Sequence, residues 1–172
     1  MAGISTGATA IAKVALGAAE IMKISIGATE IWAAITPVSS MKMNRTTTQN
    51  LATQSVYEKI VSMVAITGTH PATVIVDNEL QADGNGTWDL AVAITHSNTS
   101  SGSGVRVSRK RLGEGGYTVL QTFSTSGTFH TGVSGTIPGV VVESGDLYRV
   151  EAMHANFSTR DITTTTLTAT AV

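Results

Sequence analysis

The sequence contains no cysteine and few aromatic residues, which make up 5% of the chain. Disulfide bonds, thiolate metal sites and cysteine nucleophiles are therefore excluded. Sugar-binding sites stack ligands on tyrosine and tryptophan rings, and Trp32, Tyr117 and Tyr148 are the candidates for that role. With so few aromatic residues, we interpret each of them first as a core or interface anchor.

Charge is equally scarce, because Asp, Glu, Lys and Arg together form 13% of the residues and the net charge is −1. This balance gives no electrostatic reason to expect binding to nucleic acid or to an anionic membrane. The most apolar stretch is interrupted by Lys13, Glu20, Lys23 and Glu30, so we expect no membrane span and no signal peptide. So little charge is typical of a protein whose surface is largely covered by other subunits.

Residues 4–33 consist of one ten-residue phrase written three times, ISTGATAIAK, VALGAAEIMK and ISIGATEIWA. A fixed internal period indicates a structural unit that buries its apolar surface against its neighbours. Ten helical residues fall about 80° short of three turns, so repeated positions would spiral around a helix. In an extended chain they return to the same face. We therefore predict short strands, with an Ala-rich helix as the alternative.

In this interpretation Glu20–Ile26 is one strand, with Met22, Ile24 and Ile26 on one side, and Gly27-Ala28 is a two-residue turn. The repeats end near Thr36. The organisation predicted is a repeat segment over 1–36, a polar connector over 37–55 and a β-sandwich over 56–172.

From Val56 onward, short apolar runs alternate with turn-rich segments, which is typical of an all-β, jelly-roll-like sandwich of about seven to nine strands. The clearest strand has Trp88, Leu90, Val92 and Ile94 on its buried face. We favour a strand over a short helix for Val56–Thr67. Further predicted strands cover 73–76, 105–112, 117–123, 137–142, 147–154 and 162–171, and Gly102-Ser103-Gly104 and 113–116 are predicted turns.

Residue types that could carry chemistry are present but poorly placed. Asp83 to Asp89 spaces its oxygen side chains like a calcium loop, but Ile94 stands where the bidentate Glu is needed. The histidines (His70, His96, His130 and His154) share no metal-ligand spacing, and the carboxylates nearest in sequence (Glu143, Asp146 and Glu151) surround a predicted turn. Arg109-Lys110-Arg111 would alternate across a strand. We expect no enzyme activity, no cofactor and no essential metal.

Residues 24–32, Ile-Ser-Ile-Gly-Ala-Thr-Glu-Ile-Trp, resemble the N-terminal repeats of small tail-associated proteins of long-tailed bacteriophages, especially those that infect actinobacteria. In that family a β-sandwich follows the repeats and ends in a Gly-Asp pair before a strand, followed by a Thr-rich strand. Residues 144–150 and 161–167 fit this pattern. The resemblance implies a virion structural protein, with no catalytic residues to carry over.

We therefore expect a minor tail protein, made in the host cytoplasm and located in the virion, that contacts other virion proteins. Two readings stay open beside it: a module that binds a host cell-surface glycan or protein, and a capsid decoration or head fibre protein. A small sheet cannot bury both faces alone, so we expect a homo-oligomer, a trimer, with the repeats in the interface. The predicted interface residues are Ile11, Ile21, Ile24, Ile31 and Trp32.

Overall fold

A computed structural model describes residues 14–16, 19–21, 23–26, 29–33, 36–155 and 160–172. The chain divides into two compact units, residues 1–36 and 37–172, and the boundary coincides with the predicted end of the repeats. Every regular element among the described residues is a β-strand, as the all-β prediction expects. No helix in this part of the chain is long and apolar enough to cross a membrane.

The described part of the repeat unit forms two short antiparallel hairpins. β1 (Val14–Leu16) pairs with β2 (Ala19–Ile21), and β3 (Lys23–Ile26) pairs with β4 (Thr29–Ala33). The predicted strand over 20–26 is thus divided between two hairpins. The predicted turn at 27–28 lies outside the described residues, but the residues that flank it, Ile26 and Thr29, are direct partners.

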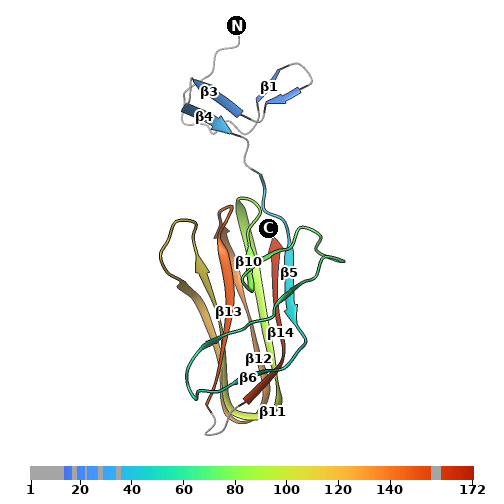
Figure 1. The fold of residues 1–172 in the computed structure, drawn as a ribbon, viewed down its shortest axis with the longest axis vertical. Coiled ribbons are helices and arrows are strands. Elements are labelled where there is room, and N and C mark those ends of the chain that lie inside the picture. The colour runs from blue at the N-terminus through green and yellow to red at the C-terminus, as the bar shows by residue number, and fades with distance from the viewer. Residues whose placement is uncertain (1–13, 17–18, 22, 27–28, 34–35, 156–159) are drawn as a thin grey trace. The chain divides into compact units, whose positions relative to one another are not determined.

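The larger unit is an antiparallel sandwich of ten strands (Figure 1). In chain order they are β5 (Met41–Arg45), β6 (Gln49–Leu51), β7 (Glu58–Lys59), β8 (Val64–Ala65), β9 (Val74–Val76), β10 (Glu79–Gln81), β11 (Gly86–Lys110), β12 (Thr118–Val142), β13 (Leu147–His154) and β14 (Arg160–Ala171). β11 and β12 are far longer than the others, and each turns back at the lower end of the view (Figure 1).

These two bent strands belong to both layers of the sandwich. The first layer contains β8, β5, β14, the beginning of β11 and the end of β12. The second contains the beginning of β12, the end of β11, β13, β10 and β9. Among the described strands, β12 pairs only with β11, so β12 forms an edge of both layers.

The core lies between the layers and includes the predicted face of β11. Trp88, Leu90, Val92 and Ile94 are all at most 4% exposed, which confirms the predicted register. Strict alternation of large apolar residues with small or polar ones places one set inward and the other outward. Met41 and Met43 of β5 are fully buried against the same core.

Three boundaries differ from the sequence interpretation. The predicted connector over 37–55 belongs to the sandwich, because β5 pairs with β14 along five residues. The predicted strand over 56–67 holds only the short β7 and β8, separated by Ser62, which has a positive φ of 58°. The predicted turn at Gly102–Gly104 is a continuous part of β11. A Cβ on Gly104 would collide with the hydroxyl of Tyr57, so this glycine makes room for that ring.

Candidate interaction surfaces

The outer face of the second layer carries a network of buried charges centred on Glu151 of β13. Its carboxylate accepts hydrogen bonds from Arg106 at 2.9 and 3.0 Å, from Ser108 at 2.7 Å and from Arg149 at 3.0 Å. The side chain is only 5% exposed. Burial would raise the pKa of Glu151, but the hydrogen bonds and the two guanidinium charges outweigh burial and lower it. The carboxylate is therefore held ionised.

Aromatic rings continue this network on both sides. The Arg106 guanidinium lies 4.4 Å from the ring centre of Tyr57, and that of Arg149 lies 3.7 Å from the ring centre of Tyr117. The Tyr117 hydroxyl donates to Glu79 at 2.5 Å, and Glu79 also pairs with Lys59 at 2.6 Å. Burial and the bond to Glu79 raise the pKa of Tyr117 to about 12.

The network joins the strands on the two sides of β13. Lys59 of β7 and Glu79 of β10 come from short strands that pair with β13, and Tyr57 directly precedes β7. Arg106 comes from β11, which also pairs with β13. Each charged member has a partner of opposite sign. Such a self-satisfied arrangement holds a fold together and leaves little charge to attract a ligand.

The oxygen side chains considered as calcium ligands make hydrogen bonds that stabilise the fold. Oxygens of Asp83, Asn85 and Asp89 each accept a backbone N–H from another segment, at 2.8 to 3.0 Å. The oxygen side chains of residues 83–89, which are spaced like a calcium loop, therefore hold this turn against neighbouring segments. Among the described residues, no group of three or more His, Cys, Asp or Glu side chains could hold a metal ion.

The remaining candidates are separated in space or partnered. Tyr148 is fully buried, and Tyr117 is covered by Arg149, so they do not form a shared stacking platform. Asp146 is buried and accepts from the N–H of Glu143, which closes the predicted turn. The basic cluster points to three partners: Arg109 to the Val141 carbonyl, Lys110 to the Tyr117 ring and Arg111 to Glu143.

The predicted interface residues fall in the repeat unit. Ile11 lies outside the described residues. The backbones of Ile21, Ile24, Ile31 and Trp32 belong to β2, β3 and β4, and Ile24 is the direct partner of Trp32. The register shifts beside this pair, at Ile31. The burial of these side chains stays a prediction.

A second surface was not foreseen from the sequence. We define the uncharged face as the outward side chains of three neighbouring first-layer strands, which are Ala91, Ala93 and Thr95 of β11, Ser134 and Thr136 of β12, and Thr164, Thr166 and Thr168 of β14. The register sets them in rows, such as Ser134–Ala93–Thr166. All are small, so a partner can approach the sheet closely.

The edge strand β12 borders this face and is also uncharged. Its 25 residues, 118–142, include no Asp, Glu, Lys or Arg. This absence was the sequence signal that could have revealed the surface, because natural proteins usually protect exposed edges with charge. Pro138, exposed on this strand, conforms to the restriction of proline to edges.

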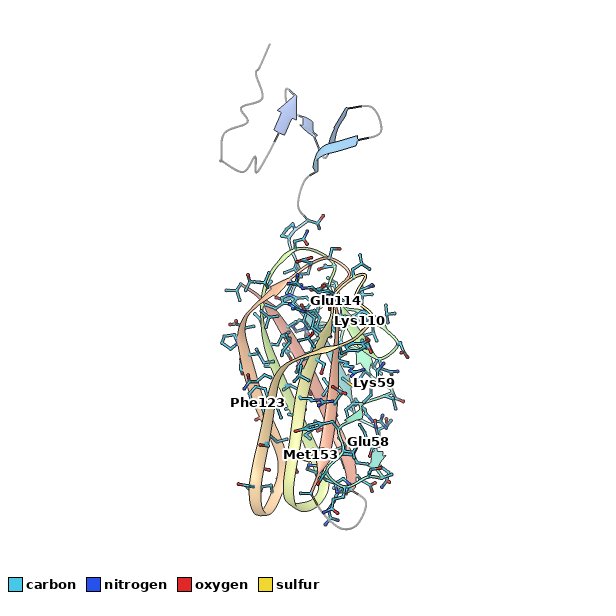
Figure 2. All side chains as sticks on the ribbon, turned by 90° about the vertical axis from the view of Figure 1, so that its left-hand side faces the viewer. Glu58, Lys59, Lys110, Glu114, Phe123 and Met153 are labelled. Atoms are coloured by element: carbon cyan, nitrogen blue, oxygen red, sulfur yellow. The ribbon has the colours of Figure 1, made fainter. Side chains whose placement is uncertain are left out.

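A groove of about 740 Å³ runs between the two halves of β12. Threonine and serine side chains line it together with Phe123, whose ring lies where a Cβ on Gly135 would be. Figure 2 shows Phe123 on one side of the sandwich and the network residue Lys59 on the other. The uncharged edge and the charged network are thus on different sides of the molecule.

No family model matches the chain, and no curated protein matches it in sequence. Solved structures do. The Eiger TNF of S. frugiperda superposes with a TM-score of 0.58 at 10% identity, covering 80% of this chain and 94% of that one. Murine APRIL gives 0.57 at 13% identity, covering 78% and 99%. The globular domain of zebrafish complement 1qA gives 0.51 at 11% identity, covering 78% and 97%. The sandwich therefore has the jelly-roll-like fold of these TNF and C1q domains.

Proposed function

We propose that the chain is a structural component of a bacteriophage virion, a minor tail protein that assembles as a homotrimer. In this role the N-terminal repeats dock onto other virion proteins or onto one another, and the sandwich is presented outward. The role is non-catalytic and requires no cofactor. The resemblance of residues 24–32 to phage tail repeats supports the virion assignment.

The observation that carries self-assembly is the pairing of two uncharged surfaces on one sandwich. The β12 edge and the uncharged face adjoin one another, and Ala93, Thr95 and Ser134 of the face also line the groove. The two surfaces differ in shape, because the edge is one side of a single strand, whereas the face spans three strands and is hollowed by about 380 Å³. Contact between the edge of one copy and the face of the next is head-to-tail. A head-to-tail contact needs at least three copies to close a ring, which favours the trimer.

Both surfaces are suited to burial between protein chains. Small side chains lose little conformational entropy when they are covered, and uncharged ones avoid the desolvation penalty of buried ions. Burying the β12 edge also removes a template for uncontrolled strand pairing.

Sedimentation velocity of the full-length protein tests the assembly. We expect a species of three times the 17.8 kDa chain mass. Ala93→Arg, which adds charge at the centre of the uncharged face, should shift the protein to monomer. Leu112→Arg adds the same charge on a loop residue that is 80% exposed, and it should leave the trimer intact.

A second pair of variants separates the two units. If Ile21→Asp dissociates the trimer into monomers while Ala93→Arg does not, the trimer interface lies in the repeats alone. A wild-type protein that sediments as a monomer would refute self-assembly. The virion assignment is tested separately, by labelling purified particles with a gold-conjugated antibody against residues 37–172. Absence of the chain from such particles would overturn it.

A further inference from the structure

A cluster of buried polar side chains lies between the layers at the end where β11 and β12 turn back. We call it the buried polar cluster, and its members are His96, Ser103, His154 and Thr165, at most 4% exposed. The register places Ser103 directly between Thr125 and His154 in the second layer. His96 and Thr165 belong to the first layer. On the neighbouring strand β5, the direct partner of Thr165 is Arg45, which is 5% exposed.

Two hydrogen bonds of the cluster connect one layer to the other. His96 Nε2 lies 2.6 Å from Ser103 Oγ, which joins the two halves of β11 across the core. His154 Nε2 lies 3.1 Å from the carbonyl oxygen of Leu51, which joins β13 to β6. β6 in turn pairs with β14 of the first layer. Both imidazoles therefore hold the layers together at this end.

The geometry also identifies the tautomer of His154. A carbonyl oxygen only accepts, so the Nε2 of His154 must carry the proton, and its Nδ1 then has a lone pair. The Nδ1 atoms of both His96 and His154 are buried and have no hydrogen-bond partner among the described residues. At His96 a neutral ring tolerates that position far better than an imidazolium does, because a buried charge without a partner is strongly disfavoured.

The surrounding charges add to this preference. Arg160 on β14 is positive, and its charge and that of His154 reinforce burial in lowering the pKa of His96. Asp161, also on β14, accepts from Asn50 at 2.8 Å. On β12, His130 bonds to the Ser126 carbonyl, and β6 contributes no titratable group. β5 contributes the buried Arg45, whose guanidinium donates to Gln49, and β7 contributes Glu58, which pairs with Ala152 and accepts from the N–H of Thr53. Burial is the largest of the causes that lower the pKa of His96.

We propose that the buried polar cluster is a pH-dependent latch, which closes this end of the sandwich while the His96 imidazole is neutral and opens it when that ring is protonated. In the opened state the His96 ring reaches water and can be charged freely. The open form therefore binds more protons than the closed form. Its population rises as pH falls below the ordinary histidine value of about 6.5.

Nitrogen NMR of the full-length protein, with ¹⁵N-labelled histidine, tests the closed state directly. We expect His96 to be neutral at pH 7.5 and to remain neutral at pH 6. A His96 that titrates at or above the ordinary value would overturn the proposal. This measurement needs no substitution, so it does not depend on any variant folding.

Hydrogen exchange tests the opening. The amide of Ala155, which donates to the Gly102 carbonyl, reports on this end, and the amide of Ala82, which donates to the Asp146 carbonyl, reports on the opposite end. Once corrected for intrinsic exchange, the opening constant at Ala155 should rise as pH falls, by up to about tenfold per pH unit, the limit for one proton bound at His96. The constant at Ala82 should not change in this range. Equal changes at both amides, or none at Ala155 between pH 7.5 and 5.5, would refute the latch.

A substitution assigns the proton to His96. His96→Gln keeps a polar group but cannot titrate, and it should remove the pH dependence of the opening constant at Ala155. His70→Gln is the matched control, because His70 bonds to the neighbouring Thr69 far from the cluster in sequence. The control should leave the pH dependence unchanged. A pH dependence reduced equally by both variants would show that His96 is not responsible.

Discussion

The indole of Trp88 meets the ring of Tyr148 edge to face, with ring centres 5.2 Å apart and planes inclined at 61°. Trp88 belongs to the first layer and Tyr148 to the second, so this pair joins the layers at the end of the sandwich opposite the buried polar cluster. The indole N–H donates to the Ser39 carbonyl at 2.9 Å. Both rings are fully buried.

We predict that the two rings are energetically coupled. In a double-mutant cycle of Trp88→Leu and Tyr148→Leu, the coupling free energy should be about 0.5–1.5 kcal/mol, the range of edge-to-face aromatic pairs. Urea unfolding of the four proteins measures it. Additive effects of the two substitutions would mean that the rings contribute only through the area each one buries.

The buried face of β11 makes a second prediction. Leu90→Ala should lower the free energy of unfolding by about 2–4 kcal/mol, because Leu90 is fully buried and its removal leaves a cavity. Val141→Ala on the paired strand is the control. Its side chain is 59% exposed, so the change should stay within about 0.5 kcal/mol. Similar losses at both positions would show that burial does not distinguish them.

The charge network predicts a dependence on acid. Glu151→Gln should cost about 2–3 kcal/mol at pH 7, because Arg106 and Arg149 lose a shared charged acceptor. Since the pKa of Glu151 is lowered in the folded state, its contribution is complete above the unfolded value of about 4.3. It is lost as pH falls through the lower folded value.

The matched control is Glu143→Gln, which breaks an exposed ion pair with Arg111. Its effect should remain under about 1 kcal/mol. Denaturant unfolding from pH 7 to pH 3 compares the variants. If wild type and Glu151→Gln lost stability in parallel below pH 4.5, the ionised carboxylate would not be the source of the effect.

Alkaline titration makes a fourth prediction, on the tyrosines. Burial raises the pKa of Tyr57, Tyr117 and Tyr148, with Glu79 adding to the effect at Tyr117 and Asp146 at Tyr148. These are all three tyrosines of the chain. The folded protein should show less tyrosinate absorbance at pH 10 than the unfolded chain, in which each tyrosine is about half ionised.

The sign of the linkage follows from that comparison. Above pH 10 the unfolded chain loses phenolic protons that the folded chain keeps, so stability decreases as pH rises. Ultraviolet absorbance should therefore increase together with unfolding, and not before it. The urea-unfolded protein, titrated in parallel, provides the reference. Equal tyrosinate absorbance of the folded and the unfolded protein at pH 10 would contradict the raised pKa values.

The strands predicted most accurately from the sequence are those whose pattern is local. β11 alternates large apolar residues with small ones at 88–95, and β13 has the predicted bounds, Leu147–His154. β5 was missed because Lys42, Asn44 and Arg45 accompany its two methionines, and its burial depends on β14, more than 110 residues later.

Long-range contacts explain the other errors. Gly102–Gly104 has the composition of a turn, and only the position of Tyr57 shows why small residues are needed within a strand there. The charge network joins residues from four strands, so no spacing along the chain predicts it. The uncharged stretch at 118–142 is visible in the sequence, but its importance depends on knowing that β12 lies at an edge.

The long hairpin of β11 and β12 has a consequence for how the protein folds. Arg109 and Thr118 pair next to its loop, within the second layer, and Gly86 and Val142 pair at its far end, within the first. The register of the pairing shifts on both sides of Ser100, where the hairpin passes from one layer to the other. A slip of one residue would turn a layer's core residues outward, and the irregularities at the bend allow such a slip to stay within one layer. The hairpin thus connects the two layers while each layer keeps a register of its own.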